Sequence, residues 1–136
     1  MNLSEAFGKY GAKPGGKIRG LSAIAADGAM VLNCSHSYFG HPTRGVLRYE
    51  DRLSREASDT RDAELLGQHL TLARDGALPV RMVVASQPLP HAKKSVTRSF
   101  HVRVDLIGKI VKFDGDHFIV DFTRKPEKVE STKRRK

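Results

Sequence analysis

The chain has 136 residues, the length of one domain, and its 39% apolar residues can form a core without disulfides or a metal. Cys34 is the single cysteine, which excludes an internal disulfide and fits a reducing compartment. No run approaches the about 18 apolar residues that a membrane span requires. Residues 1–17 lack the apolar centre of a signal peptide. We therefore expect a cytoplasmic protein that does not enter a membrane.

Positive charge is the strongest compositional feature, with a formal net charge of +9 and a pI near 10.0. From Arg124 onward seven Lys and Arg residues stand against two Glu residues, so this segment carries +5 and the rest +4. A positive potential attracts polyanions whatever their sequence. We therefore expect nucleic acid, either DNA or RNA, as the partner.

The first part of the chain predicts a short helix and a hairpin. Residues 3–10 fit a helix capped by Asn2, and the Gly-rich, basic segment 11–20 follows. Two apolar runs, 21–26 and 29–34, are separated by Asp27–Gly28, which is a strong signal for a tight hairpin turn. We expect residues 1–20 to be a flexible lead-in to the folded domain.

One helix stands out in the rest of the chain. Between residues 61 and 75 apolar side chains recur at helical spacing, and Gly76 is the expected end of that helix. A second Asp-Gly turn, at residues 114–115, joins the apolar runs 102–113 and 117–122 into another hairpin. The remaining predicted segments are a loop (35–44), a strand (45–49), a strand (78–85) and a proline-containing basic loop (87–99).

These elements predict an α+β fold, a small curled antiparallel β-sheet or barrel with one main helix. The folded domain spans residues 21–124. Residues 125–136 are rich in charge, which predicts a disordered basic tail in which Lys133, Arg134 and Arg135 add non-specific attraction.

The loop 35–44 holds the candidate base-binding residues. Tyr38 and Phe39 are adjacent aromatics, and with Arg44 they suit a site that stacks a base and holds its phosphate. In the structural alternative, Phe39 turns into the core while Tyr38 covers the sheet. We expect one ring buried and one exposed.

A basic stretch is the candidate phosphate-binding element. It contains no acidic residue before Asp105, so its positive charge is not expected to be cancelled locally. The alternative is an ordinary solvated loop. Its basic residues are His91, Lys93, Lys94, Arg98, His101 and Arg103.

Metal and nucleotide chemistry have weaker signals. Cys34, His36 and His41 lie within eight residues and have zinc-compatible side chains, but the sequence offers no fourth ligand. Residues 11–17 match the spacing of a phosphate-binding loop, yet Ile18 stands where a Ser or Thr would be required. We predict no cofactor and assign no catalytic residue.

The segments Leu21–Ile24, Asp27–Gly28, Val31–Leu32 and Tyr38–Phe39 resemble a strand-turn-strand pattern of small bacterial PUA-like proteins. Such folds include readers of modified bases in DNA or RNA, some of them linked to restriction systems. The resemblance implies a curled β-barrel whose concave face receives a base, flipped from the duplex. The tryptophans that those strands often carry are absent here.

The leading hypothesis from the sequence is a non-catalytic nucleic-acid-binding module. One alternative is a small metal-dependent nuclease or hydrolase that uses Cys34, His36 and His41. The other is a protein-interaction subunit whose basic surface docks on an acidic partner.

Overall fold

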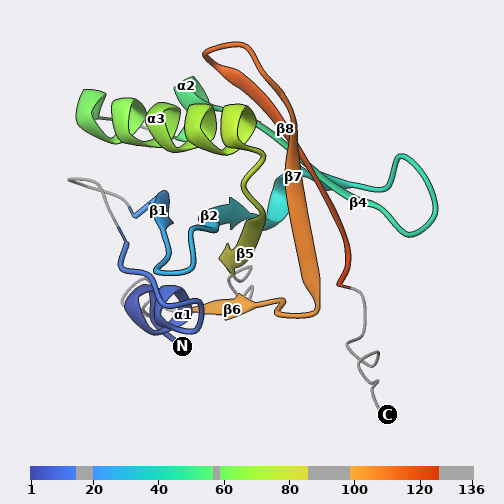
Figure 1. The fold of residues 1–136 in the computed structure, drawn as a ribbon, viewed down its shortest axis with the longest axis horizontal. Coiled ribbons are helices and arrows are strands. Elements are labelled where there is room, and N and C mark those ends of the chain that lie inside the picture. Colours follow the sequence, from blue (N-terminus) through green and yellow to red (C-terminus); the bar gives the residue numbers. More distant parts are fainter. Residues whose placement is uncertain (15–19, 57–58, 86–98, 126–136) are drawn as a thin grey trace, which may run out of the picture.

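The computed structural model describes residues 1–14, 20–56, 59–85 and 99–125. Figure 1 shows the arrangement of the elements. In chain order they are α1 (Leu3–Gly8), β1 (Ser22–Ile24), β2 (Met30–Ser35), the 3₁₀ turn η1 (His36–Tyr38), β3 (Phe39–Gly40), β4 (Leu47–Arg52), α2 (Leu53–Glu56), α3 (Thr60–Gly76), β5 (Val80–Ala85), β6 (Phe100–Val102), β7 (Leu106–Phe113) and β8 (His117–Arg124).

The strands of the described residues form one mixed sheet in the order β1-β2-β5-β7-β8-β4-β3, with β6 paired to β5. The α+β class with one main helix is confirmed, but the antiparallel sheet or barrel is wrong. β2 and β5 run parallel, from Met30 opposite Val80 to Ser35 opposite Ala85. A parallel pair needs a long crossover, and α3 lies within the connection between these two strands. The sheet is not closed, because β1 and β3 stand at opposite ends of the strand order.

Both predicted Asp-Gly hairpins form. Gly28 and Gly115 have φ of 91° and 108°, a backbone region that favours glycine. The second hairpin begins at Leu106 rather than at residue 102, since residues 100–102 form β6 and pair with β5 instead.

α3 packs on one face of the sheet and supplies Leu66, Leu70 and Ala73 to the larger core cluster. The helix does not end in a left-handed Gly76. Ala77 adopts that conformation, with φ of 53°, and its N–H donates to the carbonyl of Ala73. None of the helices in the described ranges has the length and apolar character needed to cross a bilayer.

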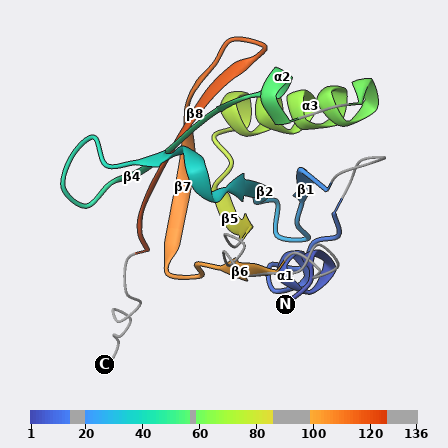
Figure 2. The same cartoon turned by 180° about the vertical axis from the view of Figure 1, so that it is seen from behind.

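α1 packs on the opposite face of the same strands, as Figure 1 and Figure 2 show. Its cap is a capping box between Asn2 and Glu5. Phe7 is fully buried against Val31 and Val83, whose neighbours along the strands face the α3 side. Residues 1–14 therefore pack on the sheet, and residues 15–19 of the predicted lead-in lie outside the described residues.

A charged cleft beside strand β4

A cleft of about 520 Å³ lies beside β4, next to the short strand β3. The two residues of β3 pair with Arg48 and Tyr49 of β4. The rest of β4 extends beyond this pairing and leads into α2. The cleft is lined by Tyr38, Phe39, Gly40, His41, Pro42, Arg48, Glu50, Asp51, Arg52, Arg55 and His117.

A buried carboxylate forms the floor of this region. Asp51 has no solvent exposure, and the Tyr49 hydroxyl donates to its Oδ2 at 2.7 Å. The Arg52 backbone N–H donates to Oδ1 at 2.8 Å, while the Ser35 N–H donates to the Tyr49 hydroxyl at 2.9 Å. Burial raises the pKa of Tyr49 well above its ordinary value, so this hydroxyl stays protonated and remains a donor.

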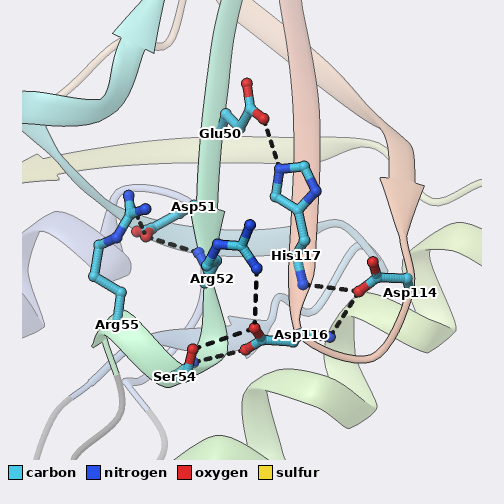
Figure 3. A network of polar contacts seen from close by, with 8 residues as sticks. All are labelled: Glu50, Asp51, Arg52, Ser54, Arg55, Asp114, Asp116 and His117. Atoms are coloured by element: carbon cyan, nitrogen blue, oxygen red, sulfur yellow. Dashed lines mark hydrogen bonds and ion pairs between the residues drawn. The ribbon is translucent and has the colours of Figure 1, made fainter.

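Arg55 connects the buried carboxylate to the cleft. Its Nη1 lies 3.3 Å from Asp51 Oδ1, and its guanidinium carbon lies 4.2 Å from the centroid of the Tyr38 ring. The Arg55 side chain is 40% exposed and is therefore partly solvated. Its guanidinium is also contacted by two protein groups, the Asp51 carboxylate and the Tyr38 ring. Figure 3 shows Arg55 and Asp51 on one side of β4.

The other face of β4 carries charges that pair across to β8. Arg48 and Asp121 are directly opposite in the sheet and form a bidentate pair, with N–O distances of 2.7 and 2.9 Å. The hydrogen bond from Arg48 lowers the pKa of the Asp121 carboxyl. His117 Nε2 lies 2.6 Å from Glu50 Oε2, and Figure 3 shows this contact bridging the two strands.

The turn between β7 and β8 fixes the start of α2 beside the cleft. Asp116 accepts hydrogen bonds from the Ser54 N–H and hydroxyl, at 2.9 and 3.2 Å. Arg52 Nη1 lies 3.4 Å from the same carboxylate, and Asp114 accepts the His117 N–H (Figure 3). The Ser54 N–H lowers the pKa of Asp116, so the acceptor stays ionised at neutral pH.

The predicted base-binding loop is only partly in this site. Tyr38 and Phe39 both line the cleft, but both are half-buried against the core, so the expectation of one buried and one exposed ring is wrong. The Phe39 ring packs 5.0 Å from the Tyr49 ring. Arg44 is exposed in the following turn and is not part of the cleft wall.

The predicted phosphate-binding stretch is described only from residue 99. Arg103 forms a bidentate pair with Asp105, at 3.0 and 2.8 Å, which lowers the pKa of Asp105 to about 2. The charge of Arg103 is thus cancelled locally, contrary to expectation. His101 is exposed on β6. The remaining candidates lie outside the described residues, namely His91, Lys93, Lys94, Arg98, Lys133, Arg134 and Arg135.

The residues considered for metal binding are not brought together. Cys34 is fully buried in the larger core cluster, His36 belongs to η1, and His41 is exposed at the cleft. In the parts of the chain that the structure describes, no group of three or more His, Cys, Asp or Glu residues could hold a metal ion. Strand β2 directs Cys34 inward with Leu32, and this separates the thiol from the loop.

Most of the polar cleft residues were not singled out from the sequence. Residues 48–52 alternate inward and outward along β4, so their dense charges divide between the two faces of the strand, and Arg55 follows on α2. That density was a usable local signal. The contacts of this segment with His117 and Asp121 have no such local signal, because they join residues far apart in the sequence. Glu50 and His117 are 67 positions apart.

Charge is unevenly divided between the described residues and the others. The described residues hold 14 Lys and Arg against 13 Asp and Glu, a net charge of +1. The other +8 belongs to three ranges, 15–19, 86–98 and 126–136. Most of the net positive charge therefore lies outside the described residues, and the described body is nearly balanced.

A second hollow, of about 700 Å³, adjoins α1, β1 and α3. Lys13 and His69 are its titratable residues, and the His69 Nδ1 lies 2.7 Å from the buried Ser22 hydroxyl. Burial lowers the pKa of His69, which favours the neutral ring at neutral pH. This hollow lacks the combination of aromatic and guanidinium groups found beside β4.

No family model, curated protein or solved structure matches this chain.

Proposed function

We propose that this protein is a nucleic-acid-binding module, for DNA or RNA, whose cleft beside β4 receives one nucleotide. The observation that carries the proposal is the meeting of Tyr38, Arg52 and Arg55 in one cleft of about 520 Å³. Aromatic and guanidinium planes bind bases by stacking, and guanidinium groups also bind phosphate oxygens.

In this proposal, recognition of the base and attraction of the nucleic-acid backbone belong to different residues. Glu50 and Asp51 bring negative charge into the cleft, which disfavours a site for phosphate alone. Glu50 is 52% exposed and offers carboxylate oxygens to the N–H groups of a base. Backbone attraction then comes from the basic ranges outside the described residues, with Lys93, Lys94 and Arg98 as the leading phosphate contacts.

The PUA-like resemblance of segments between residues 21 and 39 adds a modified or flipped base as the preferred ligand, although the sheet here is open and not the barrel that the resemblance implied. The metal-dependent hydrolase is less favoured, because Cys34 is in the core and away from a shared ligand set. Docking on an acidic protein is the rival, since the same basic ranges serve both partners.

Fluorescence-anisotropy titrations with labelled DNA and RNA, repeated over a range of salt concentrations, test the proposal. We expect the double variant Lys93→Ala, Lys94→Ala to weaken binding of all sequences alike. Each lost phosphate contact lowers the slope of log affinity against log salt by about 0.7 to 0.9. The control is Arg61→Ala with Arg74→Ala, which removes the same charge from α3, outside the cleft.

Absence of binding to every DNA and RNA at low salt contradicts the proposal. Equally tight binding of polyglutamate favours the acidic-protein partner instead. A control double variant that loses as much affinity and slope as the lysine pair shows that only overall charge matters.

A further inference from the structure

We propose that the cleft takes an unpaired base, and that this base stacks on the Arg55 guanidinium rather than on the Tyr38 ring. This inference rests on the proposed function and specifies the ligand of the same site.

The Tyr38 ring is already occupied. The Arg55 guanidinium lies over it at 4.2 Å from the ring centroid, and Tyr38 also packs against the core cluster. A base would have to displace Arg55 to reach the covered face of the ring. Arg55 lines the cleft and its side chain is 40% exposed, so its guanidinium is the planar group that a base can reach at this point.

Arg55 is held in place before any ligand arrives. Asp51 contacts it at 3.3 Å, and that carboxylate is fully buried and fixed by hydrogen bonds from Tyr49 and the Arg52 N–H. Two supports, a ring and a carboxylate, reduce the side-chain freedom that would be lost on binding. A guanidinium supported by a ring and a carboxylate is a stacking surface for bases in recognition of single-stranded nucleic acid.

Stacking on Arg55 requires a base with a free face. In a duplex both faces of each base are covered by its neighbours, so the nucleotide must be single-stranded or flipped out. Glu50 lines the same cleft from the other face of β4, and His117 contacts it at 2.6 Å, so the cleft also holds an oriented acceptor.

The test compares three labelled ligands: a single-stranded 12-mer, the same strand with abasic central nucleotides, and the blunt 12-bp duplex. Loss of a stacked base contact lowers affinity by about 5- to 150-fold. We expect the protein to prefer the 12-mer over the abasic strand by a factor in this range. Arg55→Ala should remove this preference, while affinity for the abasic strand should fall only as far as the loss of one cation requires.

Arg55→Lys separates stacking from charge. It keeps a cation beside Asp51, so the fold and the salt slope should persist, while the preference for a base over an abasic site falls. The matched control is Arg74→Ala, whose guanidinium lies 5.8 Å from the Phe113 ring centroid and pairs with Asp75 outside the cleft.

Equal affinity for the 12-mer and the abasic strand overturns this inference while the proposed function stands. Arg55→Lys behaving as the unchanged protein also overturns it, because charge alone would then explain the effect of Arg55→Ala. A preference for the duplex overturns the unpaired base. Failure of all three ligands to bind contradicts the proposed function itself.

Discussion

Replacing the buried carboxylate under the cleft, Asp51→Ala, should destabilise the fold by about 3 kcal/mol. The Tyr49 hydroxyl and the Arg52 N–H each lose an acceptor, at 2.7 and 2.8 Å. An unsatisfied buried donor costs about 1–3 kcal/mol. Arg55 is 40% exposed and can return to water, so the loss of its ion pair adds at most about 1 kcal/mol.

Urea unfolding followed by circular dichroism measures this effect as a lower midpoint with an unchanged slope. The matched control is Asp116→Ala, since Asp116 also accepts several hydrogen bonds but its side chain is 43% exposed. We expect the control to cost clearly less than Asp51→Ala, because its partners can bind water instead. If Asp51→Ala lowers the free energy of unfolding no more than Asp116→Ala does, Asp51 is not the buried hydrogen-bond acceptor that we infer.

A double-mutant cycle isolates the hydrogen bond between Tyr49 and Asp51. Tyr49→Phe removes the donor, and the combined variant should cost less than the sum of the two single changes, by about 0.5–3 kcal/mol. Additive costs would refute a direct interaction between the two side chains.

Two further changes test the packing and the electrostatics of the sheet. Gly108→Ala places a methyl group 2.7 Å from the Phe122 ring and should cost about 1–3 kcal/mol of unfolding free energy. In α3, the methyl group of Gly67→Ala makes only an ordinary contact, at 3.6 Å, and should raise the free energy of unfolding by about 0.5–1 kcal/mol. Equal effects of the two glycine substitutions would contradict the close packing of Gly108 against Phe122. Arg103 lowers the pKa of Asp105 from 3.8 to about 2, so the contribution of Asp105 to stability is full above pH 3.8 and lost as the pH falls toward 2. Asp105→Asn should flatten the acid limb of a stability-against-pH curve in this window, and an unchanged limb would contradict the pair.

Local signals in the sequence determined the hairpins, the main helix and the α+β class. Asp27–Gly28 and Asp114–Gly115 define their turns because each needs a glycine at positive φ, and that requirement depends only on the backbone. The spacing of Leu66, Leu70 and Ala73 placed α3, since one buried face at helical period is also a local property.

Only the tertiary structure decided the strand order and the cleft. The parallel pairing of β2 with β5 depends on where the chain returns after α3, which the pattern within a strand does not encode. Likewise, the sheet register brings Glu50 to His117 and Arg48 to Asp121, over separations of 67 and 73 residues. Arg55 covers Tyr38 because α2 begins at the end of β4, held by the Asp116 turn. These contacts join segments that are far apart in the sequence. They contribute to stability only after packing of the core has brought those segments together.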